Sequence, residues 1–375
     1  MKFSVLSSDL QKALARIISV VPSKSTLQIL ENVLFDLSGG ELTLTASDLE
    51  LSMSVTIKVE GMEDGRVTVP AKILNETMRA LPSMDITFIA DKASHGITVK
   101  TEQGSYRMSG DSAVNFPEEE QVAEEFSVEL DAQLLRSIVT KTSFAVTTDD
   151  LRPSMMGVLM QWREDEFRAV ATDGHRLVQL RHSGALASAD TGGEREVIIP
   201  AKALNILSRS LDQGPVSVVF GKSHVRFSFL GMRMVSRIID ERYPNYESVI
   251  PLDNDITLEV NRTQLQAVVN RCAIFSNAVT HQVRFAISGS ELTVSAEDQE
   301  YGGEAREMIP AVYSGDAEMM VGFNARYVVD ALSHLDSENV TFSFSSPTRA
   351  GLLRPTIQPE DLNILMLVMP LRLNS

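Results

Sequence analysis

The chain of 375 residues contains one cysteine, Cys272, and one tryptophan. A single thiol cannot form an internal disulfide and is too few for a cysteine-based zinc site. No segment approaches the ~20 consecutive apolar residues of a membrane helix. The amino terminus lacks the charged region, apolar core and cleavage site of a secretory signal. We therefore expect a soluble protein of the reducing cytoplasm, with no membrane partner.

Positive charge is also scarce, because 34 lysines and arginines oppose 50 acidic residues and leave a net charge of −16. A polyanionic partner normally requires clustered lysine and arginine, so this total alone argues against nucleic acid. The six histidines are scattered, and neither a His-Glu-x-x-His motif nor a calcium loop occurs. We expect no metal and no other cofactor.

One sequence pattern recurs three times, at a spacing of 125 residues. Its copies are Leu42–Asp48, Phe167–Asp173 and Leu292–Asp298. A second pattern, Val-Pro-Ala-Lys at 69–72, recurs at 199–202 and, in degenerate form, at 322–326. Polar stretches at about 116–126 and 243–256 separate the copies. We predict three domains, residues 1–120, 126–250 and 255–375.

Apolar periodicity is shared by the three copies. In each, a short strand leads to a helix, alternating strands follow, a second helix opens near the Pro-Ala-Lys position, and further strands close the unit. The predicted fold class is α+β, with two helices on antiparallel sheet in every domain. The expected helical windows are 10–21, 71–80, 132–148, 201–210, 262–278 and 324–334.

These windows hold eleven basic residues against only two acidic ones, so the remainder of the chain carries the acidic excess. Lys72 and Arg79 are seven residues apart, as are Lys202 and Arg209, so each pair lies on one helix face. Solvated helix faces often carry basic residues. Six such helices together instead favour a surface that holds a polyanion by its phosphates. No aromatic residues interleave with the basic ones, which disfavours a single-strand stacking platform.

The chain resembles the bacterial DNA polymerase III beta subunit. The resemblance rests on the three repeats, the amino-terminal Met-Lys-Phe strand, Thr172–Leu177 (Thr-Asp-Gly-His-Arg-Leu) and Val368–Leu373 (Val-Met-Pro-Leu-Arg-Leu). It covers essentially the whole chain. It implies a head-to-tail homodimer whose six domains form a ring around duplex DNA, with helices lining the hole. The implied partners are the polymerase III alpha subunit, the clamp loader and other replication and repair proteins.

The resemblance and the charge pattern together give candidate contacts for DNA. Lys24 and Arg152 match family positions near DNA, and the other candidates come from the basic helices. The full set is Lys12, Arg16, Lys24, Lys72, Arg79, Arg136, Lys141, Arg152, Lys202, Arg209 and Arg271. The implied dimer interface joins Tyr106 and Met108 in one chain to Ile274 and Phe275 in the other. The acidic run Glu297, Glu300 and Glu304 is expected to face Lys100 and Arg107. The alternative for Ile274 and Phe275 is the core of the third domain.

The resemblance also implies a cleft in the second domain that holds linear motifs of partner proteins. The matching positions are Met155, Thr172, Gly174, His175, Arg176, Leu177, Pro244, Val249, Val368, Met369, Pro370, Leu371 and Arg372. A mostly apolar groove with a few polar groups is suited to peptides. The alternative for Val368–Leu373 is an ordinary last strand. The segment 345–359 aligns poorly, and no cleft residue is assigned to it.

Catalytic interpretations are weak. Asp173 and His175 are neighbours on a turn, where side chains rarely face each other, and no Gly-x-Ser-x-Gly elbow occurs. Gly221-Lys222-Ser223 ends like a phosphate-binding loop, but the preceding glycine, Gly214, is misplaced, so we expect a hairpin turn. The chain is expected not to be an enzyme. The remaining alternative is a repeat scaffold that binds only proteins.

Overall fold

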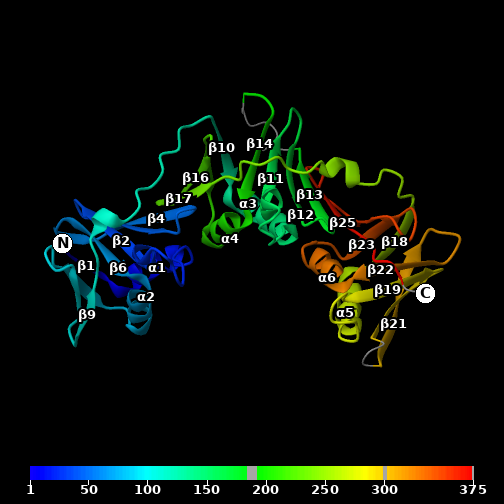
Figure 1. Cartoon of the computed structure of the whole chain (residues 1–375), viewed down its shortest axis with the longest axis horizontal. Helices are drawn as coiled ribbons and strands as arrows, with labels where there is room; N and C mark the ends of the chain where they lie inside the picture. Colours follow the sequence, from blue (N-terminus) through cyan, green and yellow to red (C-terminus); the bar gives the residue numbers. More distant parts are fainter. Residues whose placement is uncertain (184–191, 299–301, 374–375) are drawn as a thin grey trace. The chain divides into compact units, whose positions relative to one another are not determined.

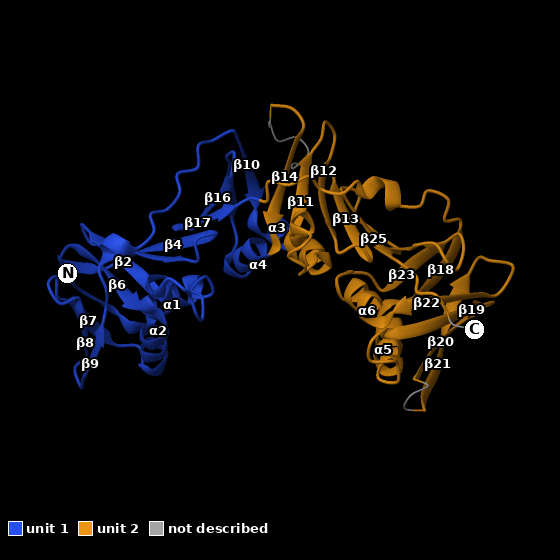
Figure 2. Ribbon diagram, viewed as in Figure 1, with its two compact units in different colours: residues 1–136, 202–238 blue, residues 137–201, 239–375 orange. Residues whose placement is uncertain are grey.

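The computed structural model describes residues 1–183, 192–298 and 302–373. The chain, coloured along its sequence in Figure 1, divides into two compact units. Unit 1 comprises Met1–Arg136 and Lys202–Ile238, and unit 2 comprises Ser137–Ala201 and Ile239–Ser375 (Figure 2). Within the described residues, no helix is both long and apolar enough to cross a membrane.

Unit 1 contains two antiparallel sheets. The first has the order β5-β1-β7-β8-β9 and the second the order β10-β15-β16-β17-β4-β3-β2-β6. The strands of the first are β1 (Lys2–Leu6), β5 (Glu60–Glu63), β7 (Asp85–Ala90), β8 (Gly96–Lys100) and β9 (Ser105–Ser109). Those of the second are β2 (Asn32–Ser38), β3 (Glu41–Ser47), β4 (Leu51–Lys58), β6 (Gly65–Pro70), β10 (Phe126–Asp131), β15 (Pro215–Phe220), β16 (His224–Phe229) and β17 (Met232–Arg237).

Unit 2 contains a single 12-stranded sheet of order β14-β11-β12-β13-β25-β24-β23-β18-β21-β20-β19-β22. Its strands from the central part of the chain are β11 (Gly157–Trp162), β12 (Phe167–Thr172), β13 (Arg176–His182) and β14 (Arg195–Pro200). The later ones are β18 (Ile256–Asn261), β19 (Gln282–Ser288), β20 (Glu291–Asp298), β21 (Gly303–Tyr313), β22 (Met319–Asn324), β23 (Asn339–Phe344), β24 (Gly351–Pro355) and β25 (Leu362–Val368).

The predicted repeat is confirmed, because a pair of helices accompanies each set of antiparallel strands. The helices are α1 (Ser7–Ile17), α2 (Ala71–Ala80), α3 (Ala132–Thr142), α4 (Ala201–Ser210), α5 (Arg262–Ala273) and α6 (Ala325–Ser333). Single turns of 3-10 helix occur at η1 (Gln28–Glu31), η2 (Ala113–Asn115), η3 (Ser143–Ala145), η4 (Pro153–Met156) and η5 (Tyr246–Val249). The central repeat is shared between the units, since β10 and β15 to β17 belong to unit 1 and β11 to β14 to unit 2.

Backbone pairing joins adjacent repeats. Strand β17 pairs with β4 in the register Met234↔Met53, and β13 pairs with β25 over seven positions from Arg176↔Val368 to His182↔Leu362. Each pairing continues a sheet from one repeat into the next. The hydrogen-bonded sheets therefore extend beyond the sequence repeats.

Several helix ends differ from the predicted windows, since α1 ends at Ile17 in place of 21 and α3 ends at Thr142 in place of 148. Helix α1 begins at Ser7, three residues early, where the Ser7 hydroxyl donates to the carbonyl of Pro82 (2.7 Å) and accepts from the amide of Met84 (3.0 Å). Helix α5 ends at Ala273. The Asn277 side chain, which accepts from the amide of Val279 (3.0 Å), fixes a turn beyond it. Hydrogen bonds of polar side chains lie at both ends, to a segment distant in sequence for Ser7 and within a local turn for Asn277, and apolar periodicity does not detect them.

The cores follow the expected periodicities. Leu10, Leu14 and Ile17 occupy one face of α1 and are fully buried. In unit 2, strand β19 buries every second residue, and its Phe285 ring meets that of Phe323 edge to face at 5.5 Å. These cores leave the polar faces of the helices outward and support the loops around the pocket described next.

Candidate functional site

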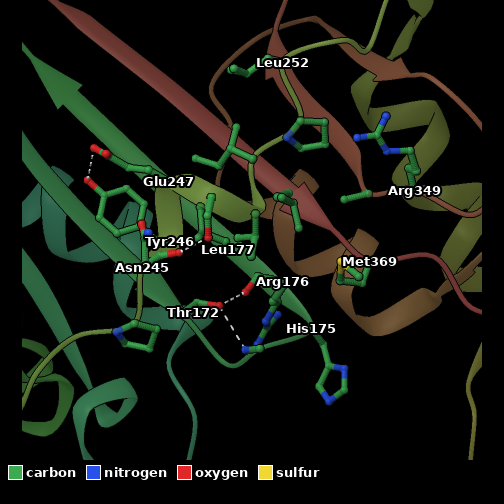
Figure 3. Close-up of a pocket in the computed structure, with 18 of the residues that line it drawn as sticks. Thr172, His175, Arg176, Leu177, Asn245, Tyr246, Glu247, Leu252, Arg349 and Met369 are labelled. Atoms are coloured by element: carbon green, nitrogen blue, oxygen red, sulfur yellow. Dashed lines mark hydrogen bonds between the residues drawn. The ribbon is translucent and has the colours of Figure 1, made fainter.

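A pocket of about 860 Å³ opens on unit 2. It is bordered by the turn between β12 and β13, the segment 244–253, the loop before β24 and the end of β25 (Figure 3). Of the predicted cleft residues, it is lined by Met155, Thr172, Gly174, His175, Arg176, Leu177, Pro244, Val249 and Met369. The remaining lining residues are Asn245, Tyr246, Glu247, Ser248, Ile250, Pro251, Leu252, Asp253, Thr348, Arg349, Ala350 and Leu367.

The floor of this pocket is an apolar cluster on one face of the sheet. Leu177 of β13 pairs with Leu367 of β25, which pairs in turn with Leu352 of β24. All three are nearly fully buried, and Tyr246 packs into the same cluster. An apolar floor under an open mouth is suited to burying an apolar group away from water.

Leu367 was not predicted, whereas Val368 was. Neighbouring residues of a strand point to opposite faces, so only one of the two can face the pocket. Leu367 lines it, and Val368 is buried on the other side of β25. Pro370, Leu371 and Arg372 do not line it either, because the chain turns toward β22, where the amide of Leu371 donates to the carbonyl of Gly322 (2.8 Å).

The turn from Thr172 to Arg176 is held by its own side chains. The Thr172 hydroxyl donates to the carbonyl of Arg176 (2.6 Å) and accepts from the amide of Gly174 (3.1 Å). Asp173 Oδ1 accepts from the amides of His175 (2.9 Å) and Arg176 (3.0 Å). Asp173 thus shapes the turn and does not orient an imidazole, and Gly174 supplies the positive φ of 90°.

Arg176 is almost completely engaged within the protein. Its Nε donates to Asp173 Oδ2 (3.1 Å), Nη1 to Asp330 Oδ2 (2.5 Å) and Nη2 to the carbonyl of Phe144 (2.7 Å). The guanidinium also lies over the rings of Phe144 (5.3 Å) and Tyr327 (4.8 Å). Arg176 is one of the cleft positions implied by the family resemblance. It does line the pocket, but its role in this geometry is to brace the wall.

Arg152, predicted to lie near DNA, supports the same turn. Its Nη1 donates to the carbonyl of Asp173 (2.7 Å) and its Nε to Asp149 Oδ2 (2.9 Å). Hydrogen bonds from two arginines therefore converge on residues 172–176. This bracing preorganises the wall of the pocket before any ligand arrives.

Three further charged residues line the pocket and were not predicted from the sequence, namely Glu247, Asp253 and Arg349. Burial opposes ionisation of Glu247, but Arg163 and Arg168 outweigh it and hold the pKa of this carboxyl below its usual value. Arg349 forms an ion pair with Asp253 at 2.5 Å. Thr348, Arg349 and Ala350 all come from the poorly aligned segment 345–359. No periodic pattern marks that loop, and only the register of β23 with β24 brings it to the pocket.

The basic candidates for DNA contact fall into two groups. Ion pairs hold one group: Lys12 with Asp9, Arg16 with Asp212, Lys141 with Asp336, Arg152 with Asp149, Lys202 with Asp48 and Arg271 with Glu307. The other group is exposed and has no ion pair within the described part of the chain: Lys24, Lys72, Arg79, Arg136 and Arg209. Asp9 lies inside α1 but outside the predicted window, so that window overstated the positive charge of the helix.

The candidate dimer residues are accessible. Tyr106 and Met108 belong to β9, the edge strand of its sheet. Ile274 and Phe275 follow α5 with 78% and 43% of their surface exposed, which excludes the alternative that they are buried core. Glu297 lies near Arg284 (3.7 Å), Glu304 is exposed, and Glu300 lies outside the described residues.

The segment Gly221–Ser223 is the predicted hairpin turn, between β15 and β16.

Comparisons with known proteins agree over the full length. A beta sliding clamp of Pseudomonas putida is 31% identical over 379 residues, and that of Escherichia coli is 31% identical over 382 residues, each with 100% of both chains covered. Among solved structures, the sliding clamp of Pseudomonas aeruginosa bound to griselimycin has a TM-score of 0.92 at 30% identity. The clamp of Bartonella birtlesii bound to griselimycin has a TM-score of 0.93 at 29% identity. Both superpositions cover 100% of each chain.

Family assignments cover each repeat separately. Residues 1–120 match the N-terminal domain of the DNA polymerase III beta subunit, residues 129–245 its central domain and residues 247–372 its C-terminal domain. The three domains occur in the family's own order. The chain therefore belongs to the DNA polymerase III beta subunit family.

Proposed function

We propose that the protein is a DNA sliding clamp, a non-catalytic subunit that encircles duplex DNA and tethers the replicative polymerase for processive synthesis. The full-length likeness to beta sliding clamps carries this proposal. The outward basic side chains of the helices add physical support, because phosphate contacts that ignore sequence permit sliding. The protein acts in the cytoplasm, where the chromosome of a bacterium is replicated.

Duplex DNA is held mainly by the basic residues without internal ion pairs. Lys72, Arg79 and Arg209 can release counterions from phosphates without first giving up a carboxylate. Residues such as Lys202, which is paired with Asp48, have to exchange one anion for another. The contacts are therefore weak and exchangeable, which suits movement along DNA.

The ring closes as a head-to-tail homodimer. Strand β9 ends one sheet of unit 1. Strand β21 pairs with β18 only at Ala311–Tyr313, so the earlier part of that strand has one edge without a partner among the described residues. Exposed strand edges are ready templates for pairing with another chain. Tyr106, Ile274 and Phe275 add apolar contact at these edges.

The domains of this clamp span residues 1–120, 126–250 and 255–375. Their linkers coincide with the polar stretches that separate the repeats. The pocket of unit 2 receives linear segments of partner proteins, namely the polymerase III alpha subunit, the clamp loader and other replication and repair proteins. An open apolar floor with a braced polar wall supports this use of the pocket.

Retention on topologically closed DNA tests the proposal. The protein is loaded onto nicked circular duplex by a clamp loader, and the complex is separated by gel filtration before and after linearisation. A clamp stays on the circle and is lost from the linear ends. A scaffold that binds only proteins, the alternative function, shows no retention on either form. Light scattering on the free protein checks the dimer, and a monomer at micromolar concentration contradicts ring closure.

A further inference from the structure

The charged groups on the pocket differ in their availability to a ligand. Three hydrogen bonds occupy the guanidinium of Arg176, and only 12% of its side-chain surface is exposed. Glu247 is paired with both Arg163 and Arg168. The ion pair of Arg349 and Asp253 is different, because each group has a single ionic partner among the described residues and 53% and 60% of the two side chains remain exposed. Among the described residues that line this pocket, it is the ion pair in which a charged group of a ligand can replace one of the partners.

This pair stands at the rim of the apolar floor. Arg349 directly precedes Ala350, a member of the floor cluster, and Asp253 follows Leu252, which is 97% exposed. Figure 3 shows Arg349 and Leu252 on the same side of the pocket, away from His175. A peptide whose apolar side chains enter the floor passes within reach of this guanidinium.

The guanidinium of Arg349 has unused donors. Within the described residues, its one side-chain hydrogen bond runs from Nη1 to Asp253 Oδ2. An arginine carries five N–H donors arranged as a fork that matches a carboxylate. A second carboxylate can therefore bind beside Asp253 or replace it. The cost is small because Asp253 is exposed and returns to water.

We propose that Arg349 is a specificity-determining residue that selects partner segments carrying an acidic side chain beside their apolar anchors, with Asp253 as the internal competitor. This inference rests on the proposed use of the pocket for partner peptides. The net charge of −16 gives acidic peptides no general attraction to the protein. A preference for glutamate over glutamine must therefore arise locally, from a cation such as Arg349.

The test uses matched synthetic peptides of about eight residues. Each contains a leucine and a phenylalanine as apolar anchors, and a single glutamate or glutamine is scanned through the other positions. For at least one position, the wild-type protein is expected to bind the glutamate peptide about threefold to tenfold more tightly by calorimetry at low salt. The preference should shrink as salt increases, because the pair is exposed.

Two variants of the full chain shift the preference in opposite directions. Arg349→Gln brings the ratio of the two peptide affinities to about one, mainly by lowering the affinity for the glutamate peptide. Asp253→Asn increases it, since the competing carboxylate is gone. If the pair only fastens the two loops together, both variants weaken both peptides equally, and that result overturns the inference.

A third variant separates this inference from the proposed function. Val249 is 54% exposed at the pocket, so Val249→Glu obstructs the floor without disturbing the core. If Val249→Glu loses binding of both peptides, the pocket is the peptide site. If the wild type then shows no preference for glutamate, Arg349 has no role in selection. If Val249→Glu binds both peptides normally, the pocket is not the peptide site and both proposals fail.

Discussion

Arg176 joins parts of unit 2 that are distant in sequence. Its partner Asp330 is 154 residues away, and the carbonyl of Phe144 is 32 residues away. Arg176 and Asp173 each expose only 12% of their side chains, so removing the guanidinium leaves the Asp173 carboxylate without compensation. Its effect is therefore expected in the stability of unit 2, before any effect on a ligand.

Arg176→Gln should lower the free energy of unfolding of unit 2 by about 2–4 kcal/mol. The tryptophan, Trp162, is buried in unit 2, so its fluorescence during urea unfolding reports on this unit. Arg326→Gln, at an exposed position of α6, is the control and should change stability by less than about 0.5 kcal/mol. Equal effects of the two substitutions would show that the hydrogen bonds of Arg176 add nothing to stability.

Glu119 offers a prediction for pH. Burial raises the pKa of this carboxyl above its usual value of 4.5, and the attraction of Arg233 and Arg226 only partly offsets the effect. A folded protein that binds a proton more tightly than the unfolded chain gains stability as the pH falls through the folded pKa. Glu119→Gln should therefore raise stability at pH 7, and its advantage should disappear near pH 4.5. An advantage that does not change with pH would contradict the raised pKa.

Some pocket residues could be predicted from the sequence and others could not. The family motif at 172–177 identified the wall of the pocket, because its residues are adjacent in the chain and shape one turn. The pair of Arg349 and Asp253 is separated by 96 residues and depends on the register of β24. Neither composition nor spacing contains that register. Val368 was predicted in place of Leu367 for a related reason. The pairing of β25 with β13 decides which side chains of β25 point toward the pocket.

At the scale of elements, the carboxy-terminal segment serves two structures. Strand β25 completes the large sheet up to Val368, and the residues after it border the pocket and reach β22. The amide of Met369 donates to the carbonyl of His175 (2.9 Å), and 41% of the Met369 side chain is exposed. Val368 therefore ends an ordinary last strand and Met369 lines the pocket, whose use by partner segments stays a prediction.

Deleting Met369–Ser375 should reduce peptide affinity at least tenfold while the dimer stays intact, because β25 remains whole and the proposed interface lies elsewhere. Calorimetry with a partner peptide and light scattering measure the two outcomes. Met369→Ala is the matched control for the side chain and should weaken binding by a smaller factor. Unchanged affinity in the truncation would refute the pocket assignment, and loss of the dimer would show that the terminus supports the whole unit.

Helices and strands were predictable where periodicity or capping residues repeat. The six predicted windows all contain helices because their apolar residues recur at three and four positions. The ion pairs of those helices were not predictable. Asp48, Asp212 and Asp336 belong to other elements and meet Lys202, Arg16 and Lys141 only in the folded units.

At the scale of the whole molecule, retention on DNA should depend on where positive charge lies. Reversing the charge at Lys72, Arg79, Lys202 and Arg209 should weaken retention on duplex DNA and lower the salt dependence by about one unit for each phosphate that is no longer neutralised. The control reverses four exposed residues outside the helices, Lys58, Lys92, Lys222 and Arg242, and so changes the net charge equally. Salt titration of both variants on circular duplex compares their slopes. Identical slopes would show that the helix faces do not contact DNA.

The pairings of β17 with β4 and of β13 with β25 make each repeat depend on its neighbours for stability. A central repeat cut out at 126–250 would carry two uncovered strand edges, and the residues of β13 are almost entirely buried in the intact protein. Uncovered apolar edges promote aggregation, so this fragment should precipitate when expressed alone. A chain that arose by tandem duplication could once have gained or lost whole copies. Because neighbouring copies now share sheets, removal of one copy would uncover a strand edge of the next, so a change in repeat number is expected to destabilise the remaining copies.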